Sequence, residues 1–132
     1  MHVVQALAAL SVGGSELVVT ELSEHLALHG YKVTVIGKDG PLSRRVVSSG
    51  ATHLDWPIGR KRLATLAYIK RLAVWLEEHR PDIIHAHSRL PAWVCWRAIA
   101  RLDATIRPAL LPACMANIRS ALTAQLWPVA TG

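Results

Sequence analysis

The sequence predicts an α/β fold in which helices cover both faces of a mostly parallel sheet. Short apolar or β-branched runs alternate with longer amphipathic segments four times along the chain. This alternation is typical of parallel sheets built from right-handed crossovers. At 132 residues, 52% of them hydrophobic, the chain has room for one domain with a sizeable core.

The first half of the chain supplies three expected strands and two expected helices. Residues 2–7 predict a short buried strand, and residues 31–37 a second, β-branched one. Between them a helix begins at Ser15, and Gly30 is well placed as the residue that follows its end. The expected apolar face of this helix consists of Val18, Val19, Leu22 and Leu26. Residues 43–50 predict a short helix and residues 51–56 a third short strand.

The second half repeats the alternation. Residues 61–79 predict a long helix whose expected apolar side consists of Leu63, Leu66, Ile69, Leu72, Ala73 and Leu76. Residues 80–87 predict a fourth strand, and residues 90–102 a further helix with Pro91 in its first turn, where proline is tolerated. Four strands alternating with four helices indicate a Rossmann-like α/β unit.

The net charge narrows the class of partner. Fifteen Lys and Arg against nine Asp and Glu give a net charge of +6, which suits a phosphorylated substrate or an anionic membrane surface. Arg60, Lys61 and Arg62 stand at a helix start, where the helix dipole disfavours them. They therefore hint at contact with anionic head groups, although a solvated basic face is the plainer alternative. With 5% aromatic residues the chain offers no stacking platform, so no nucleic acid is expected.

The N-terminus and the cysteines indicate a cytoplasmic protein. The opening residues carry no basic region of the kind that starts a signal peptide, and no apolar run is long enough to span a membrane. Cys95 and Cys114 fit neither a metal-ligand spacing nor a disulfide framework. Both are expected to be small core-facing residues in a reducing compartment.

Two places follow expected strands and are therefore candidate ligand sites, because ligands of such sheets bind at the carboxyl ends of the strands. The first is the pair Gly13 and Gly14, where backbone N–H groups and a helix N-terminus could approach a phosphate. A tight strand-to-helix turn without a ligand is the alternative. The loop lacks the G-x-G-x-x-G pattern and no acidic residue ends the second strand, which counts against a dinucleotide dehydrogenase.

The second place is the stretch "HAHSR", residues 85–89. We expect the imidazoles of His85 and His87 on opposite sides of the extended backbone, which makes them a poor metal pair. His85 is expected to pack inside the sheet, with His87, Ser88 and Arg89 emerging at its edge. Arg89 could hold a phosphate or carboxylate through its guanidinium fork, or be a solvated loop arginine. No catalytic constellation stands out, and neither a metal nor a cofactor is expected.

Three stretches in order resemble the N-terminal, acceptor-side domain of the family 4 glycosyltransferases. The first is "VGGSELVVTELSEHLALHGYKVTVIG" and the last is "RPDIIHAHSRLPAWVCWRA". Between them "GPLSRRVVSSGATHLDWPIGRK" fits the variable region of the family, where an acceptor-binding surface is often found. The resemblance runs from Val3 to about Arg107. It implies one half of a two-domain GT-B fold, whose second domain holds most of the nucleotide-sugar donor and is not in this sequence. It also implies that Gly13 and Gly14 border the cleft near the donor diphosphate, and that the "HAHS" segment points into that cleft.

The resemblance further implies the substrates and the place of action. Such enzymes transfer a sugar from a nucleotide-sugar to a glycan or lipid-linked acceptor, here expected in cell-envelope polysaccharide or lipopolysaccharide biosynthesis at the inner face of the membrane. No bound metal is needed for transfer in this fold class. Without the donor domain the chain is expected to be inactive alone, because one domain cannot orient both substrates.

The last residues, "ALLPACMANIRSALTAQLWPVATG", depart from the family, which would continue with a strand and a T-x-H-G-x-Y-S motif. Read one frame over from the third base of the Cys114 codon, the codons permit "HG(K/Q)YSVSAYSAVMA". This predicts a domain over residues 1–107 and a frameshifted tail over 108–132 that removes the strand expected to extend the sheet. Two alternatives stay open: the acceptor-binding or membrane-recruiting subunit of a split transferase, and an unrelated Rossmann-like phosphate-binding module.

Overall fold

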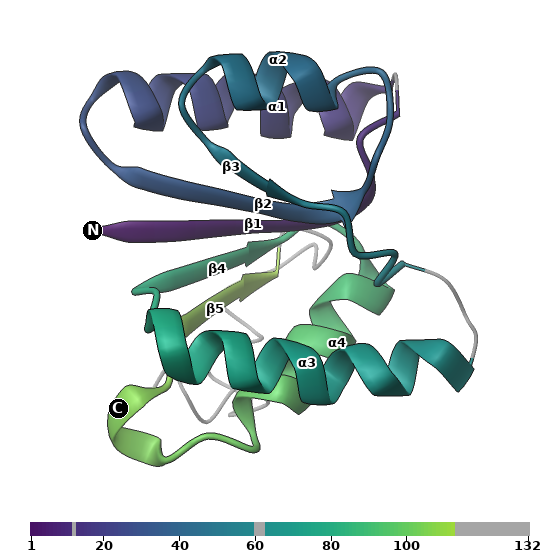
Figure 1. The fold of residues 1–132 in the computed structure, drawn as a ribbon, viewed down its shortest axis with the longest axis vertical. Helices are drawn as coiled ribbons and strands as arrows, with labels where there is room; N and C mark the ends of the chain where they lie inside the picture. Colours follow the sequence, from purple (N-terminus) through teal and green to yellow (C-terminus); the bar gives the residue numbers. More distant parts are fainter. Residues whose placement is uncertain (12, 60–62, 113–132) are drawn as a thin grey trace.

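A computed structural model describes residues 1–11, 13–59 and 63–112, and in these residues a single parallel sheet lies between two layers of helices (Figure 1). The sheet has the strand order β3-β2-β1-β4-β5, and each neighbouring pair is parallel. Its strands are β1 (His2–Ala9), β2 (Lys32–Lys38), β3 (Thr52–Leu54), β4 (Ile83–Ala86) and β5 (Ala109–Pro112). The predicted parallel, Rossmann-like α/β fold is confirmed.

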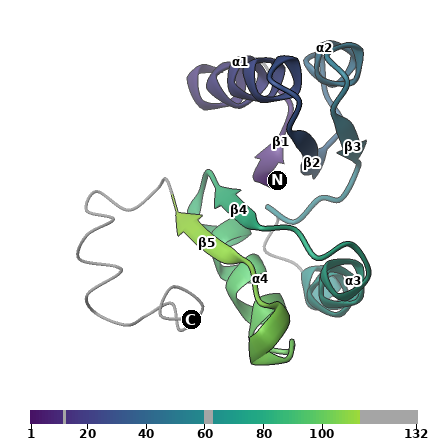
Figure 2. The same ribbon diagram turned by 90° about the vertical axis from the view of Figure 1, so that its left-hand side faces the viewer.

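The helices divide between the two faces of the sheet. Helices α1 (Gly14–Leu28) and α2 (Ser43–Ser48) cover one face, and α3 (Leu63–His79) and α4 (Arg89–Ile99) cover the other (Figures 1 and 2). A short 3-10 turn, η1 (Ala104–Ile106), leads into β5. The chain adds β2 and then β3 on one side of β1, and returns to add β4 on the other side. The strand order therefore reverses between β1 and β4, which places the switch point there.

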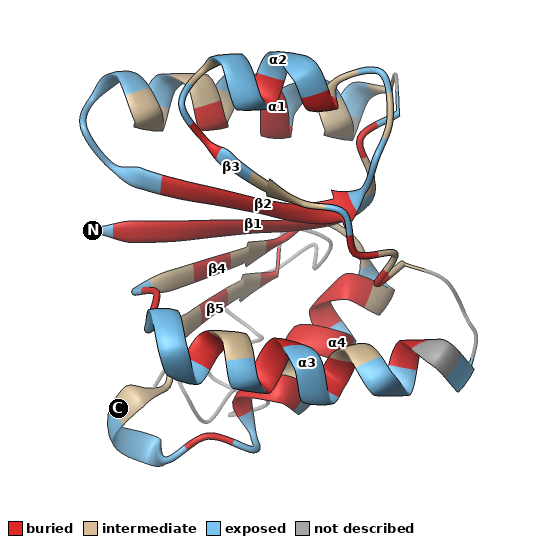
Figure 3. Ribbon diagram, viewed as in Figure 1, coloured by how far each residue is buried: buried red, intermediate tan, exposed pale blue. Residues whose placement is uncertain are grey.

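Strand residues alternate between two buried clusters, because successive side chains point to opposite faces. Val33 and Val35 pack beneath α1 and α2, whereas Val4 and Ile84 pack against α3 and α4. β1 and β2 are buried over most of their length (Figure 3). The central strand β1 and its neighbour β2 thus form the most deeply buried part of the sheet.

The expectation that the tail removes the last strand is wrong for its first residues. Ala109–Pro112 pairs with β4 in continuous parallel register, and Leu110 is fully buried against the α3–α4 layer. A short apolar run that α4 and η1 bring back beside β4 is enough to form such a strand. Residues 113–132 lie outside the described residues.

Helix α1 ends as predicted but presents a narrower apolar face. Gly30 has φ +85°, and the N–H groups of Gly30 and Tyr31 donate to Ala27 O and Leu26 O, a Schellman motif. Val19 is fully buried, but Val18 is 56% exposed, contrary to the expected face. The two lie about 100° apart around the helix, so the sheet covers only one of them.

Helix α3 shows a similar rotation of its buried stripe. Ile69, Leu72 and Leu76 are buried as predicted, but Leu63 and Leu66 are exposed. The buried stripe continues one turn earlier through Thr65, which lies four residues before Ile69. Although α3 has 17 residues, neither it nor any other helix of the described ranges is long and apolar enough to cross a membrane.

The buried position of Cys95 in α4 is confirmed. Its side chain is fully buried, and burial raises the pKa of the thiol to about 12. The thiol is therefore held in its unreactive protonated form. Cys114 lies outside the described residues.

Candidate functional site

Glycines hold the carboxyl end of β1 against its neighbours. A Cβ on Gly37 would lie 2.9 Å from the Leu7 carbonyl oxygen, and one on Gly40 would overlap the Leu10 carbonyl. A Cβ on Gly59 would overlap Ala8. Segments of β2, of the turn after β2 and of the loop after β3 thus come close to the end of β1 and to the residues that follow it. The loop that leads into α1 starts from this closely packed strand end.

The Gly13–Gly14 pair begins α1 at this end of the sheet. Gly13 is the N-cap residue in an extended conformation, and Gly14 is exposed, with open space where a Cβ would stand. The Glu16 carboxylate folds back against Gly13, at the place a side chain would occupy. A carboxylate there already complements the positive end of the helix dipole. The glycine turn therefore carries its own anion, a feature that sequence reasoning missed.

The start of α4 has the opposite electrostatic character. Ser88 is its N-cap residue, and Arg89, in the first turn, is exposed as expected. Pro91 lies at the third helical position, so the N–H that a serine N-cap usually bonds is absent. Among the described residues the Ser88 Oγ is buried without a hydrogen-bond partner. A free hydroxyl, a guanidinium and a helix N-terminus make this the more anion-attracting of the two helix starts.

His85 and His87 lie on the same side of β4, which corrects the expectation of opposite sides. Their ring centroids are 4.0 Å apart. Side chains alternate along a strand, so residues two apart share a face, and the expectation applied the alternation wrongly. His87 is also less exposed than expected at the edge: its ring is half-buried and lies over β1, with Nε2 2.6 Å from the Gln5 Oε1.

Burial keeps both imidazoles neutral. It lowers the pKa of His87 to about 4, with the nearby His85 contributing in the same direction, and it lowers the pKa of His85 as well. A neutral imidazole offers one N–H donor and one lone-pair acceptor rather than a positive charge. At neutral pH these two side chains therefore contribute hydrogen bonds, and Arg89 contributes the charge.

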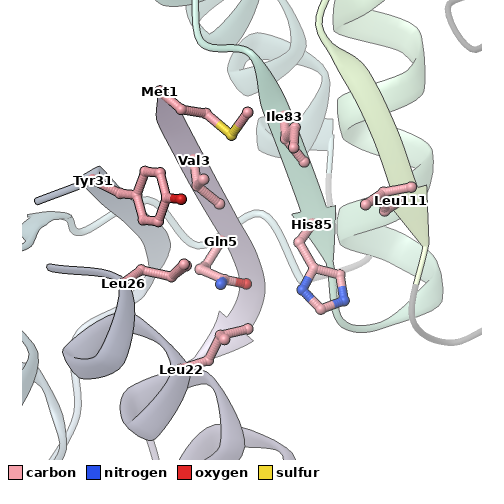
Figure 4. Close-up of a pocket in the computed structure, with 9 residues that line it drawn as sticks. All are labelled: Met1, Val3, Gln5, Leu22, Leu26, Tyr31, Ile83, His85 and Leu111. Atoms are coloured by element: carbon pink, nitrogen blue, oxygen red, sulfur yellow. The ribbon is translucent and has the colours of Figure 1, made fainter. Parts of the chain in front are cut away.

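A groove of about 270 Å³ opens on the α1 side of the sheet, next to this histidine pair (Figure 4). Its walls are apolar residues of β1, α1, β4 and β5, with Leu111 at one side and Met1 at one end. Gln5 and His85 bring polar atoms to it, and the Gln5 Nε2 has no partner among the described residues. The groove leaves part of β4 and β5 uncovered by α1.

The sequence-predicted residues thus divide into two groups. Gly13, Gly14, His87, Ser88 and Arg89 all follow β1 or β4, two strands that pair directly, so the structure brings them to one edge of the sheet (Figure 1). The basic cluster Arg60, Lys61 and Arg62 lies outside the described residues.

Sequence reasoning also missed Gln5, the partner of His87. A signal was present, since this amide stands in the apolar run "HVVQALAA" at a position that a strand buries. A buried polar side chain requires a hydrogen-bond partner, and an amide in such a run therefore indicates one.

The fold, with two helix N-termini at the switch point of a parallel sheet, defines a Rossmann-like α/β domain. The sequence matches the model of Glycosyltransferase Family 4 over residues 12–110. This match covers most of the chain, and the chain belongs to that family.

The structure is similar to a crystal structure of a glycosyltransferase from Rickettsia africae ESF-5, with a TM-score of 0.68 and 21% sequence identity. The similarity covers 84% of this chain but only 29% of the other, so the two share a fold over less than a third of the longer protein. No curated protein matches the sequence.

Proposed function

We propose that this chain is the acceptor-side half of a two-domain sugar transferase of the GT-B type. The observation that carries the proposal is the family 4 match over residues 12–110, on a sheet whose switch point gathers two helix starts. In this proposal a nucleotide-sugar is the donor and a glycan or lipid-linked molecule of the cell envelope is the acceptor. The donor is held mainly by a second domain, and the chain alone transfers no sugar.

The start of α4 is the proposed phosphate contact. Arg89 is exposed and forms no salt bridge with any of the described residues. The adjacent Ser88 hydroxyl has no hydrogen-bond partner among them. A guanidinium and a helix N-terminus together recognise phosphate oxygens well. Gly13 and Gly14 would then contribute close backbone approach rather than positive potential, because Glu16 already occupies that helix end.

The first experiment reads the coding sequence beyond the Arg107 codon. A shifted frame that spells His-Gly-x-Tyr-Ser and continues into a donor-binding domain supports the proposal, with residues 108–132 as a frameshifted tail. A shifted frame that soon meets a stop codon refutes the frameshift. The remaining proposal is then a split transferase, in which this chain is the acceptor-binding subunit.

The second experiment tests the site in the frame-restored protein, with a panel of radiolabelled nucleotide-sugars. Arg89→Ala is expected to reduce kcat/KM about 10-fold to 100-fold, the loss of one or two charge-assisted hydrogen bonds. Arg97→Ala, an exposed arginine in the last turn of the same helix, is the matched control and should change it less than about two-fold. Equal effects of the two substitutions would remove Arg89 from the proposed site.

Membrane recruitment is a separate part of the proposal and rests on Arg60, Lys61 and Arg62. Vesicles with and without anionic lipid test it in a flotation assay of the 132-residue chain. Binding that needs anionic lipid and is lost when the three residues are replaced by Ala supports recruitment. Equal binding to neutral vesicles, or no binding, contradicts it.

A further inference from the structure

Gln5 is a fully buried amide in the middle of the central strand β1. Its Oε1 lies 2.6 Å from the Nε2 of His87, and the His87 backbone N–H donates to Ala6 O at 2.8 Å. The imidazole is thus fixed to β1 by one bond from its backbone and one from its ring. In this orientation of the amide its oxygen faces the ring and can only accept a hydrogen bond, which assigns the hydrogen to the His87 Nε2.

This assignment determines what the other ring nitrogen can do. The half-buried imidazole carries a single proton at neutral pH, because burial keeps its pKa near 4. With that proton on Nε2, Nδ1 keeps its lone pair and can only accept. Among the described residues the titratable group that acts on the ring is His85, which burial also keeps neutral, so no charge from that part of the chain reverses this preference.

We infer that Gln5 is a positioning residue that holds His87 as the Nε2–H tautomer, leaving Nδ1 as a hydrogen-bond acceptor for a hydroxyl group of the ligand. The inference rests on the proposed function for the identity of that ligand, a hydroxyl-rich sugar or glycan. His87 and Arg89 then have different roles at the site. His87 binds a neutral hydroxyl, whereas Arg89 and the start of α4 bind phosphate oxygens. In this contact the ligand hydroxyl is the hydrogen-bond donor and His87 Nδ1 is the acceptor.

The test is ¹⁵N NMR of the 132-residue chain with labelled histidine, at pH 7, with His87 assigned by comparison with His87→Gln. The expected spectrum has His87 Nε2 as a protonated, pyrrole-type nitrogen and Nδ1 as an unprotonated, pyridine-type nitrogen. A protonated Nδ1, or a doubly protonated ring, would overturn the inference. Inorganic phosphate serves as a ligand probe and should leave the His87 resonances in place; a shift of Nδ1 towards the protonated form would also overturn it.

Two variants show whether Gln5 determines the tautomer of His87. Gln5→Leu removes the acceptor, so the two ring nitrogens should move towards each other as the tautomers exchange. Gln5→Glu keeps an acceptor oxygen, so Nε2 should stay protonated. Because a carboxylate beside the ring also favours a second proton on Nδ1, this variant is judged by Nε2 alone. The conclusion is then independent of whether the Leu variant folds. An unchanged tautomer in folded Gln5→Leu, or an unprotonated Nε2 in Gln5→Glu, would show that something other than Gln5 fixes the ring.

Thr34→Val is the matched control. It removes another buried contact of a histidine ring, the 2.8 Å hydrogen bond between His2 Nε2 and Thr34 Oγ1. The control should alter the His2 resonances and leave those of His87 unchanged. The measurement needs no transfer activity, so its failure would leave the proposed function standing, and a failed transferase assay would leave the tautomer result standing.

Discussion

Leu110→Ala tests whether β5 belongs to the folded sheet. Leu110 is fully buried in the larger hydrophobic cluster, at the register position opposite Ile84. Leucine-to-alanine substitutions in cores cost about 2–5 kcal/mol, since they lose transfer free energy and leave a cavity. β5 is the last strand of the described sheet, so its surroundings can relax, and we expect the free energy of unfolding to fall by about 3 kcal/mol.

The adjacent residue supplies the control. Leu111 points to the opposite face and lines the groove, where it is only partly buried. Leu111→Ala should therefore cost about 1 kcal/mol, the loss of little more than one buried methylene.

Urea unfolding followed by circular dichroism compares the two variants. With a slope of about 1–2 kcal/mol/M for a chain of this size, Leu110→Ala should lower the midpoint by roughly 2 M, and Leu111→Ala by less than about 1 M. Equal and small shifts would refute the reasoning, because they would mean that β5 is not paired with β4 in solution. Residues 109–112 would then add no stable strand, as the sequence predicts.

Three further predictions concern single residues of the described chain. Burial raises the pKa of the Cys95 thiol to about 12, so the thiol should not react with a thiol reagent at pH 8 until the chain unfolds. The reaction is measured in a Cys114→Ser variant, and rapid reaction of the folded protein would contradict the burial of Cys95. Because the pKa of His87 is about 4 when folded and 6.5 when unfolded, the unfolded state binds more protons between these values, so stability should be fully present above pH 6.5 and fall as the pH drops towards 4. His87→Gln should remove up to about 2 kcal/mol of this acid sensitivity at pH 5, and an unchanged pH slope in urea unfolding would show that His87 is charged or exposed. Gly30→Ala should lower the free energy of unfolding by about 1–2 kcal/mol, because φ is +85°. Gly14→Ala, in open space at a helix start, should leave it unchanged. Thermal unfolding of the two variants separates backbone strain from a general intolerance of alanine.

The order of elements could be predicted from the sequence because each buried stripe repeats at its own period. β2 and the core-facing positions of α3 from Ile69 onwards followed directly from that pattern. The pattern failed at Val18 and Leu63, since periodicity shows which residues are apolar but not where the sheet ceases to cover them. The pattern did not predict β5, because four apolar residues are too few to distinguish a strand from a loop.

The candidate site could be located from the sequence but not described in detail. Loops that follow β1 and β4 had to meet at one edge once the sheet was parallel, which placed Gly14 and Arg89 together. The hydrogen bond between Gln5 and His87 joins residues 82 positions apart, so no local pattern could reveal it. The Glu16 carboxylate at Gly13 was equally hidden, because it depends on which way one flexible side chain folds.

The close approach of Gly37, Gly40 and Gly59 to β1 has a consequence for how this part of the sequence can vary. Each of the three lies where even a methyl group would meet the backbone or Cβ of β1 or of the loop after it, so substitution at any of them displaces the strand end. Random mutagenesis with selection for folded protein should therefore find these positions nearly invariant. Exposed neighbours such as Lys38 and Pro41 should accept many residues. A mutational map would then show intolerance at this end of the sheet that comes from packing alone.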